Sequence, residues 1–317
     1  MVAAASRPAR LHVSPAARGD VLVRSLYSGV SRGTETIVFN GRVPRSQYAV
    51  MRAPFQEGDF PGPVKYGYLS VGCVEEGPTE LLGRNVFCLH PHQTRYVVPA
   101  DAVTPLPEGL PPERAILAGT VETALNALWD APPRIGDRVS VIGAGAVGCS
   151  VAALLARHPG VEVELVDINA ARADVARALS VDFAEPNQAA GGRDRVYHAS
   201  ATQAGLVRSL ELLAPEGCVI DLSWYGDQHV SLPLGEFFHS RRLTLRSSQV
   251  GALADEQRGK RTLADRLRLA LDLLRDDPGF DALITGESAF EELPHVMAEI
   301  ASGRLTGLCH RIRYDAN

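Results

Sequence analysis

The chain has 317 residues, of which 45% are hydrophobic and 22% charged, so it can bury a substantial core and is not intrinsically disordered. This length exceeds what one compact core usually holds, so we expect two domains, or one domain interrupted by another. The net charge is −5, and acidic and basic residues alternate along the chain. That pattern argues against a protein that binds nucleic acid or an anionic membrane.

The cysteines and the first residues predict a reduced, soluble, cytoplasmic protein. The five cysteines are odd in number and scattered, with no C-x-x-C pair, which excludes a disulfide framework or a cysteine-rich zinc site. Arg7, Pro8 and Arg10 interrupt the start of the chain before an apolar segment forms, which argues against a signal peptide. The longest apolar runs, near residues 147–155, are too short to cross a membrane.

The first third of the chain is rich in Gly and Pro and predicts a β-rich, barrel-like unit. Short strands are expected at 21–30, 68–76, 85–90 and 94–100. Between them lies a long segment without clear period, residues 44–63, which we interpret as a functional loop.

The pattern changes near residue 111, where strands begin to alternate with helices. A helix over 111–131 starts with prolines and has apolar residues at helical spacing. Strands are then expected at 138–142, 161–167, 195–200, 217–226 and 241–251, with helices at 149–157, 171–180 and 204–214. This alternation predicts a parallel, doubly wound α/β sheet, that is, a Rossmann domain.

The last part of the chain is too short for a separate domain. Its expected elements are a helix at 263–274, a strand at 282–285, a helix at 290–301 and a strand at 308–314. We therefore predict a catalytic domain made of residues 1–111 and 253–317, with the Rossmann domain, residues 112–252, inserted between them.

A glycine fingerprint, G-x-G-x-x-G, lies directly after the strand at 138–142 and opens a helix. Gly143 permits the sharp turn, Gly145 lets the backbone approach a diphosphate, and Gly148 allows close packing of helix and strand. The diphosphate would lie on the helix N-terminus, beside Ala146 and Val147. The alternative is a glycine-rich turn in another kind of α/β protein.

The last residue of the next strand indicates which dinucleotide is preferred. Asp167 lies about 20 residues after the fingerprint, where an acid binds the ribose hydroxyls and would repel a 2′-phosphate. NAD is therefore favoured over NADP, although the nearby Arg172 could soften the preference. The segment 198–202, at the carboxyl end of the strand expected at 195–200, includes Ala199; this segment and Thr120 are expected to line the nicotinamide site.

Four landmarks in this order resemble the medium-chain dehydrogenase/reductase superfamily. They are residues 28–35 (SGVSRGTE), 67–72 (GYLSVG), 136–139 (GDRV) and the fingerprint. The resemblance covers nearly the full chain and implies a GroES-like catalytic domain beside the Rossmann domain. The S-x-G-T-E variant resembles a zinc-free branch that includes bacteriochlorophyllide hydroxyethyl dehydrogenases, which oxidise a secondary alcohol to a ketone.

The resemblance also indicates where zinc-dependent members carry their metal ligands. Those positions hold Ser31, Tyr68 and Gly119 in this chain, and none of them suits an ion that prefers thiolate, imidazole or carboxylate. An alternative metal site could combine two histidines of an H-x-H pattern, which a strand would place on one face, with an acid of the linking helix: His90, His92 and Glu122. We expect no catalytic metal.

Without zinc, a side chain must exchange the proton of the substrate oxygen. We expect Tyr68 to do so, with Lys65 lowering its pKa; Lys65 is notable because the only other lysine is Lys260. The alternatives are a core tyrosine and a solvated loop lysine. Ser31 and Glu35 lie in a motif that the family uses near the active site, although Glu35 could instead pair with an arginine.

Histidine provides a further candidate for proton transfer. His90 and His92 flank Pro91 at the end of a strand, where one of them could relay protons, because histidine titrates near neutrality; a surface histidine is the commoner case. Polar and cationic side chains of the long loop suggest a small, polar, anionic or polyhydroxylated substrate; they are Arg42, Arg45, Gln47, Tyr48, Arg52 and Gln56.

The sequence leaves two other functions open. One is a quinone- or enoyl-type reductase that uses NADPH, against which Asp167 argues. The other is a dinucleotide-binding protein without catalytic activity. The segment 241–251 could form an exposed sheet edge, which predicts a homodimer.

Overall fold

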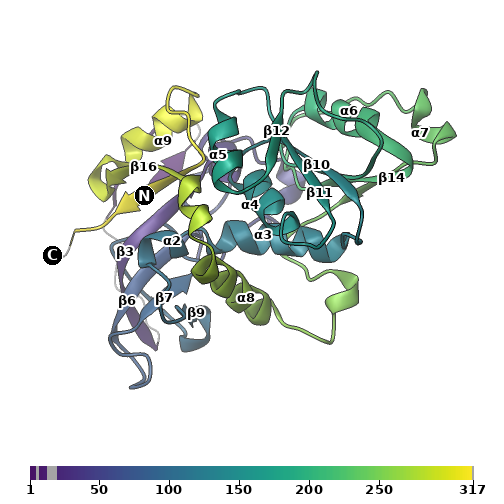
Figure 1. Cartoon of the computed structure of the whole chain (residues 1–317). Helices are drawn as coiled ribbons and strands as arrows, with labels where there is room; N and C mark the ends of the chain where they lie inside the picture. The colour runs from purple at the N-terminus through teal and green to yellow at the C-terminus, as the bar shows by residue number, and fades with distance from the viewer. Residues whose placement is uncertain (5–6, 13–19, 316–317) are drawn as a thin grey trace. The chain divides into compact units, whose positions relative to one another are not determined.

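The computed structural model describes residues 1–4, 7–12 and 20–315 (Figure 1). Residues 5, 6 and 13 of the N-terminal stretch that was considered for a signal peptide therefore lie outside the described residues. The chain forms two compact units, one of Met1–Gly119 with Leu267–Asn317, and one of Thr120–Arg266.

The first unit is built on a seven-stranded sheet with the order β16-β17-β3-β6-β7-β9, in which β8 also pairs with β3. The strands are β3 (Val21–Ser31), β6 (Ser70–Glu76), β7 (Asn85–Cys88), β8 (Arg95–Val98), β9 (Val103–Pro105), β16 (Ile284–Ala289) and β17 (Cys309–Arg313). In β3, buried and partly exposed residues alternate at first, as expected for a strand with one face on the core. Strand β17 pairs antiparallel with β3, so the C-terminal strand lies in the same sheet as the first long strand.

A smaller sheet in the same unit has the order β2-β1-β5-β4. Its strands are β1 (Val2–Ala4), β2 (Arg7–Arg10), β4 (Glu57–Gly58) and β5 (Val64–Lys65). These strands have two to four residues; β4 lies within the segment that we interpreted as a long loop, and β5 directly follows that segment.

The helices of the first unit differ from the sequence prediction in two places. Helix α1 (Arg32–Phe39) begins directly after β3 and was not predicted. The helix expected over 111–131 is broken into α2 (Pro112–Ala115) and α3 (Ala118–Asp130), because the intervening turn tightens where the amide of Leu117 bonds the carbonyl of Arg114.

The second unit is a six-stranded parallel sheet with the order β12-β11-β10-β13-β14-β15. The strands are β10 (Arg138–Ile142), β11 (Glu162–Val166), β12 (Asp182–Ala184), β13 (Arg193–His198), β14 (Leu213–Asp221) and β15 (Thr244–Ser247). Numbered along the chain, this order is 3-2-1-4-5-6, which is the doubly wound dinucleotide-binding order. The strand order therefore reverses between β10 and β13.

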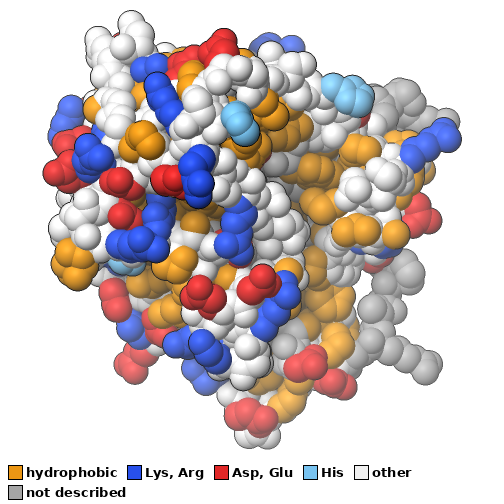
Figure 2. Space-filling model, turned by 90° about the vertical axis from the view of Figure 1, so that its right-hand side faces the viewer, with side chains coloured by type: hydrophobic (Ala, Val, Ile, Leu, Met, Phe, Trp, Pro, Cys, Tyr) orange, Lys and Arg blue, Asp and Glu red, His pale blue; other side chains and the backbone are white. Residues whose placement is uncertain are grey.

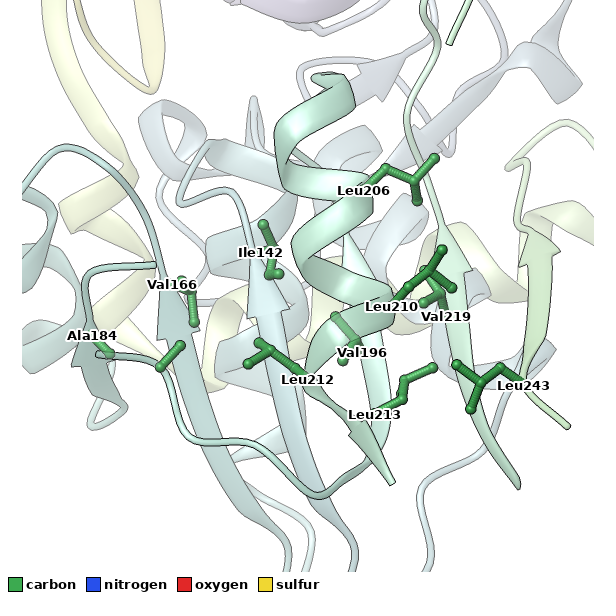
Figure 3. Packing of buried hydrophobic residues seen from close by; sticks show 11 residues of the cluster. Ile142, Val166, Ala184, Val196, Leu206, Leu210, Leu212, Leu213, Val219 and Leu243 are labelled. Atoms are coloured by element: carbon green, nitrogen blue, oxygen red, sulfur yellow. The ribbon is translucent and has the colours of Figure 1, made fainter. Parts of the chain in front are cut away.

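Helices of the second unit pack hydrophobic side chains onto this sheet. The helices are α4 (Ala146–Leu155), α5 (Arg172–Ala178), α6 (Gln203–Leu212) and α7 (Phe237–Ser240). Figure 3 shows α6 lying over the strands, with Leu206 and Leu210 in the same buried cluster as Val196 and Val219. Each such buried leucine contributes about 1.5–3 kcal/mol relative to an exposed one.

The predicted fold class, a β-rich unit with a doubly wound Rossmann unit, is confirmed. Within the described part of the chain, no helix combines the length and the hydropathy that crossing a membrane would require. On the face drawn in Figure 2, basic and acidic side chains are interspersed, in keeping with the mixed charges of the sequence.

The chain continues between the two units through α3 and through α8 (Leu263–Asp276). The remaining helix of the first unit is α9 (Leu293–Ala301), whose buried residues pack in one cluster with Val30 of β3 and Ile312 of β17.

Candidate functional site

The turn after β10 has the backbone that a dinucleotide fingerprint requires. Gly143 has a φ of +103°, and a Cβ atom there would lie 2.6 Å from the amide nitrogen of Ser200. A Cβ atom on Gly148 would lie 1.9 Å from the carbonyl oxygen of Gly143. Both positions therefore require glycine for packing, one of them also for its left-handed backbone.

The second glycine of the fingerprint has a different environment. A Cβ atom on Gly145 would meet no described atom within 4 Å, and the residue is exposed. It is the N-cap of α4, and the next two residues, Ala146 and Val147, are partly exposed. This open surface above free backbone N–H groups fits a diphosphate, because the helix dipole favours negative charge there.

Asp167, the acid predicted to bind a ribose, lies at the end of β11 and is fixed to the fingerprint loop. Its Oδ2 accepts the amide of Ala144 at 2.7 Å, and its Oδ1 accepts the amide of Asn169 at 2.8 Å. The carboxylate is partly exposed and retains acceptor capacity for ribose hydroxyls. Arg172 begins α5 a short distance along the chain and is also partly exposed.

The other residues assigned to the cofactor lie in different environments. Ala199 is partly exposed after β13, and its carbonyl carbon would lie 2.8 Å from a Cβ on Gly143. Thr120 is buried in α3. Glu122, two residues further on, accepts a hydrogen bond from the buried Arg266 at 3.0 Å.

In the first unit, the structure brings together Tyr68 and Ser31. The Tyr68 hydroxyl donates to Ser31 Oγ at 2.6 Å, joining the residue before β6 to the end of β3. Burial, followed by the nearby Glu35 carboxylate, raises the pKa of Tyr68 to about 12, despite hydrogen bonds to Ser31 and Thr34. The phenol therefore remains protonated at neutral pH.

Glu35 fixes the Ser31 end of this pair through the Ser31 backbone amide. Its Oε1 accepts the amide of Ser31 at 2.7 Å, and its Oε2 lies 2.9 Å from Nε2 of His92. The other ring nitrogen of His92 lies 2.7 Å from Ser28 Oγ, which is 2.8 Å from the Tyr314 hydroxyl. Glu35 thus pairs with a histidine and not with the arginine that we considered from the sequence.

Lys65 does not assist Tyr68 in the way that the sequence suggested. Its ammonium group donates to Glu57 and, at 2.7 Å, to Gln93. The side chain is 4% exposed, so the alternative of a solvated loop lysine is also wrong. The expectation of a lowered Tyr68 pKa is wrong, because burial raises that pKa and the Lys65 ammonium bonds Glu57 and Gln93 instead.

The two histidines of the H-x-H pattern do not lie on one strand face, because β7 ends at Cys88. His90 stacks on Tyr96 with ring centroids 3.8 Å apart, and its Nδ1 bonds the Pro91 carbonyl. Burial lowers the pKa of His90 to about 3, so it stays neutral near pH 7. A proton relay through His90 at neutral pH is therefore not supported.

Zinc does not fit the donor set of this chain. The hydroxyls of Ser31 and Tyr68 are bonded to each other, and position 119 has no side chain. Thiolate, imidazole and carboxylate are the groups that zinc prefers. His92 and Glu122, considered for another metal site, are committed to Glu35 and Arg266 respectively.

Sequence reasoning missed two polar partners that the fold supplies. His92 was considered as a metal ligand or a proton relay and not as the partner of Glu35, because a pairing over 57 residues leaves no local signal. Asp221 was not singled out, although it ends a buried strand next to the strand that ends at His198.

Comparison with known proteins places these sites in a wider context. Residues 138–205, from β10 to the start of α6, match the family described as 3-hydroxyacyl-CoA dehydrogenase, NAD binding domain. An alcohol dehydrogenase of Cupriavidus necator is 29% identical over 161 residues, 46% of this chain and 44% of the relative. A D-guloside 3-dehydrogenase of Escherichia coli is 25% identical over 183 residues, 52% and 51% of the two chains. The chain thus spans about half the length of the curated relatives it matches.

Solved structures match over nearly the whole chain. An alcohol dehydrogenase from Thermus sp. ATN1 has a TM-score of 0.74 at 21% identity, covering 99% of each chain. A 2R,3R-butanediol dehydrogenase from Bacillus subtilis has a TM-score of 0.73 at 15% identity, covering 98% of this chain and 96% of the other. The resemblance to medium-chain dehydrogenases is confirmed at the level of the fold.

Proposed function

We propose that this chain is a zinc-independent oxidoreductase that interconverts a polar secondary alcohol and its ketone with NAD in preference to NADP. The observation that carries the proposal is the hydrogen bond between Tyr68 and Ser31, at two positions where zinc-dependent relatives carry metal ligands. The names of the relatives, alcohol dehydrogenase and D-guloside 3-dehydrogenase, support the reaction class.

The second unit has the residues to hold a nicotinamide dinucleotide. Gly143, Gly145 and the first turn of α4 would bind the diphosphate, and Asp167 would bind the ribose of the adenosine half. A carboxylate at that position repels a 2′-phosphate, which supports the preference for NAD. When bound, the dinucleotide supplies a hydride donor or acceptor on its nicotinamide ring.

Tyr68 would move the proton that accompanies this chemistry. Because its pKa is about 12, its phenol is a donor for a ketone oxygen at neutral pH. In alcohol oxidation the proton goes to the deprotonated phenolate, which a higher pH favours. Ser31 Oγ accepts the phenol proton before substrate binds; once that proton turns to the ketone oxygen, the Ser31 hydroxyl would donate to the Tyr68 oxygen, and Glu35 fixes the Ser31 backbone. Positioned proton transfer of this kind typically contributes about 10²–10⁴-fold in rate.

Two observations support the proposed substrate class. D-guloside is a polyhydroxylated sugar derivative, and the loop at 44–63 carries several polar side chains. Within that loop Arg52 pairs with Asp59, and Gln56 bonds the backbone of Ala53 and Gly58, so these side chains also hold the loop together. We propose a small polyol or glycoside as substrate.

A cofactor-reduction screen over polyols, glycosides and simple alcohols, with NAD and NADP, tests the proposal. Tyr68→Phe should lower kcat by about 10²–10⁴-fold while NADH binding is retained. Tyr66→Phe is the matched control, because it removes a hydroxyl from the neighbouring ring, 6.0 Å away. Enone reduction with NADPH and no alcohol oxidation would instead identify a quinone- or enoyl-type reductase. Dinucleotide binding without turnover of any substrate would identify an inactive binding protein.

We further propose that the protein is cytoplasmic and forms a homodimer through residues 241–251. In support, β15 is the last strand of the parallel sheet and its four residues are exposed. An exposed sheet edge pairs readily with its symmetry mate. Light scattering should give a dimeric mass, and a monomeric mass at micromolar concentration would exclude this assembly.

A further inference from the structure

A buried histidine lies at the carboxyl end of the parallel sheet, outside the groups used above. His198 is 0% exposed and ends β13, directly beside Asp221 at the end of β14. Its Nδ1 lies 2.9 Å from Asp221 Oδ1, and its Nε2 lies 2.7 Å from Ser200 Oγ. The three side chains form one continuous hydrogen-bonded chain.

The direction of each hydrogen bond follows from Asp221. The Ser223 amide donates to Oδ1 at 2.9 Å and the Tyr225 hydroxyl donates to Oδ2 at 3.0 Å. Burial alone would raise the pKa of Asp221, but the bonds from His198, Ser223 and Tyr225 outweigh it and lower that pKa. An ionised carboxylate only accepts, so the Nδ1–H of His198 donates to it. In the neutral ring with its proton on Nδ1, Nε2 is an acceptor, and the Ser200 hydroxyl donates to it.

The remaining partner of Ser200 is Thr202. The two hydroxyl oxygens are 2.9 Å apart, and Thr202 Oγ1 also accepts the amide of Gly205 at 3.1 Å. Since the Ser200 proton is already used, Thr202 donates to Ser200 Oγ. The Ser200 oxygen is left with one free lone pair, so it can only accept a hydrogen bond from a ligand. A Cβ atom on Gly205 would lie 2.2 Å from Ser200 Oγ, so glycine leaves the room that this arrangement needs.

The position of Ser200 in the sheet indicates what it would meet. Ligands of open parallel sheets bind outside the carboxyl ends of the strands where the strand order reverses, here between β10 and β13. Ser200 follows β13, is partly exposed, and packs against the Gly143 turn. Asp167, which we assign to the adenosine ribose, lies on the β11 side of the position where the strand order reverses. The nicotinamide half of the dinucleotide would therefore lie on the β13 side.

We propose that His198 and Asp221 hold Ser200 as a hydrogen-bond acceptor for a ribose hydroxyl in the nicotinamide half of the dinucleotide. A hydroxyl can donate to this oxygen, whereas a phosphate oxygen, which only accepts, cannot. Ser200 contacts the cofactor, and His198 and Asp221 are positioning residues. The inference rests on the proposed function, because it takes a nicotinamide dinucleotide as the ligand.

Asp221→Ala reverses the polarity of the chain. Without the carboxylate, the hydroxyls of Ser223 and Tyr225, which lie 3.2 and 3.4 Å from Nδ1 of His198, can donate to that nitrogen. The ring then carries its proton on Nε2 and donates to Ser200, whose hydroxyl must donate outward. We expect the Kd for NADH to rise about five- to tenfold, the value of one well-placed hydrogen bond, while the Kd for ADP changes less than about twofold.

Ser200→Ala should likewise raise the Kd for NADH and leave the Kd for ADP almost unchanged. Ser200→Thr, which keeps the hydroxyl, should restore NADH binding. Ser209→Ala is the control, since it removes a buried hydroxyl from α6 that bonds the Gly205 carbonyl. Calorimetric titration with NADH and ADP measures all variants, and retained ADP binding shows that each is folded. Unchanged NADH binding in Ser200→Ala, or an equal loss of ADP and NADH binding, would overturn this inference but not the proposed function. Wild-type protein that binds no NADH would overturn the proposed function as well.

Discussion

The variant His92→Ala tests whether the buried Glu35–His92 pair stabilises the part of the fold that carries Tyr68 and Ser31. Glu35 and His92 are 3% and 1% exposed, and their side chains lie 2.9 Å apart. His92→Ala would leave the buried Glu35 and Ser28 side chains each without this hydrogen-bond partner, at about 1–3 kcal/mol apiece, so about 2–6 kcal/mol together. Each kcal/mol lowers the Tm of a domain of about 150–250 residues by about 2–4 °C, so we expect a decrease of roughly 4–24 °C.

Urea and thermal unfolding followed by circular dichroism measure this loss. Glu35→Gln is the milder comparison, because the amide oxygen still accepts the Ser31 amide, and we expect a loss of about 1–3 kcal/mol. In the double variant the two effects should not add, since the residues share one interaction. A loss below about 1 kcal/mol in His92→Ala, or additive effects in the double variant, would refute the reasoning.

Three further predictions concern the cofactor turn and a buried ring. Gly148→Ala, whose Cβ would lie 1.9 Å from a carbonyl oxygen, should destabilise the protein and abolish NADH binding, whereas Gly145→Ala should leave the Tm unchanged and weaken NADH binding roughly tenfold. Asp167→Asn should shift the ratio of kcat/KM for NADP over NAD upward by about tenfold, measured by steady-state kinetics. His90 has a pKa of about 3 when folded against 6.5 ordinarily, because of burial. Its contribution to stability is therefore complete above pH 6.5 and lost as the pH falls toward 3, and His90→Phe should flatten urea-unfolding stability over that range.

The Rossmann unit could be predicted because its signals are local. The fingerprint glycines lie within six residues of each other, and β10 is buried from its second residue to its end, as strands covered on both faces are. Strand β12 was missed because it has only three residues. The predicted acid, Asp167, was found by its position at the end of a strand.

The polar partners in the first unit could not be predicted, because they are made by pairing over long distances along the chain. Lys65 is buried because β5 lies between β1 and β4, and it reaches Gln93 across 28 residues. The same holds for Glu35 and His92, which are 57 residues apart. Motif resemblance indicated that Tyr68 and Ser31 matter, whereas only the fold showed that they bond each other.

Metal analysis of active protein tests the central claim most directly. Zinc and other divalent metals are quantified in purified enzyme that oxidises an alcohol with NAD, before and after dialysis against a chelator. The account predicts substoichiometric metal and undiminished turnover after chelation, with activity that depends on the Tyr68 hydroxyl. Stoichiometric zinc whose removal abolishes turnover and whose return restores it would contradict the account.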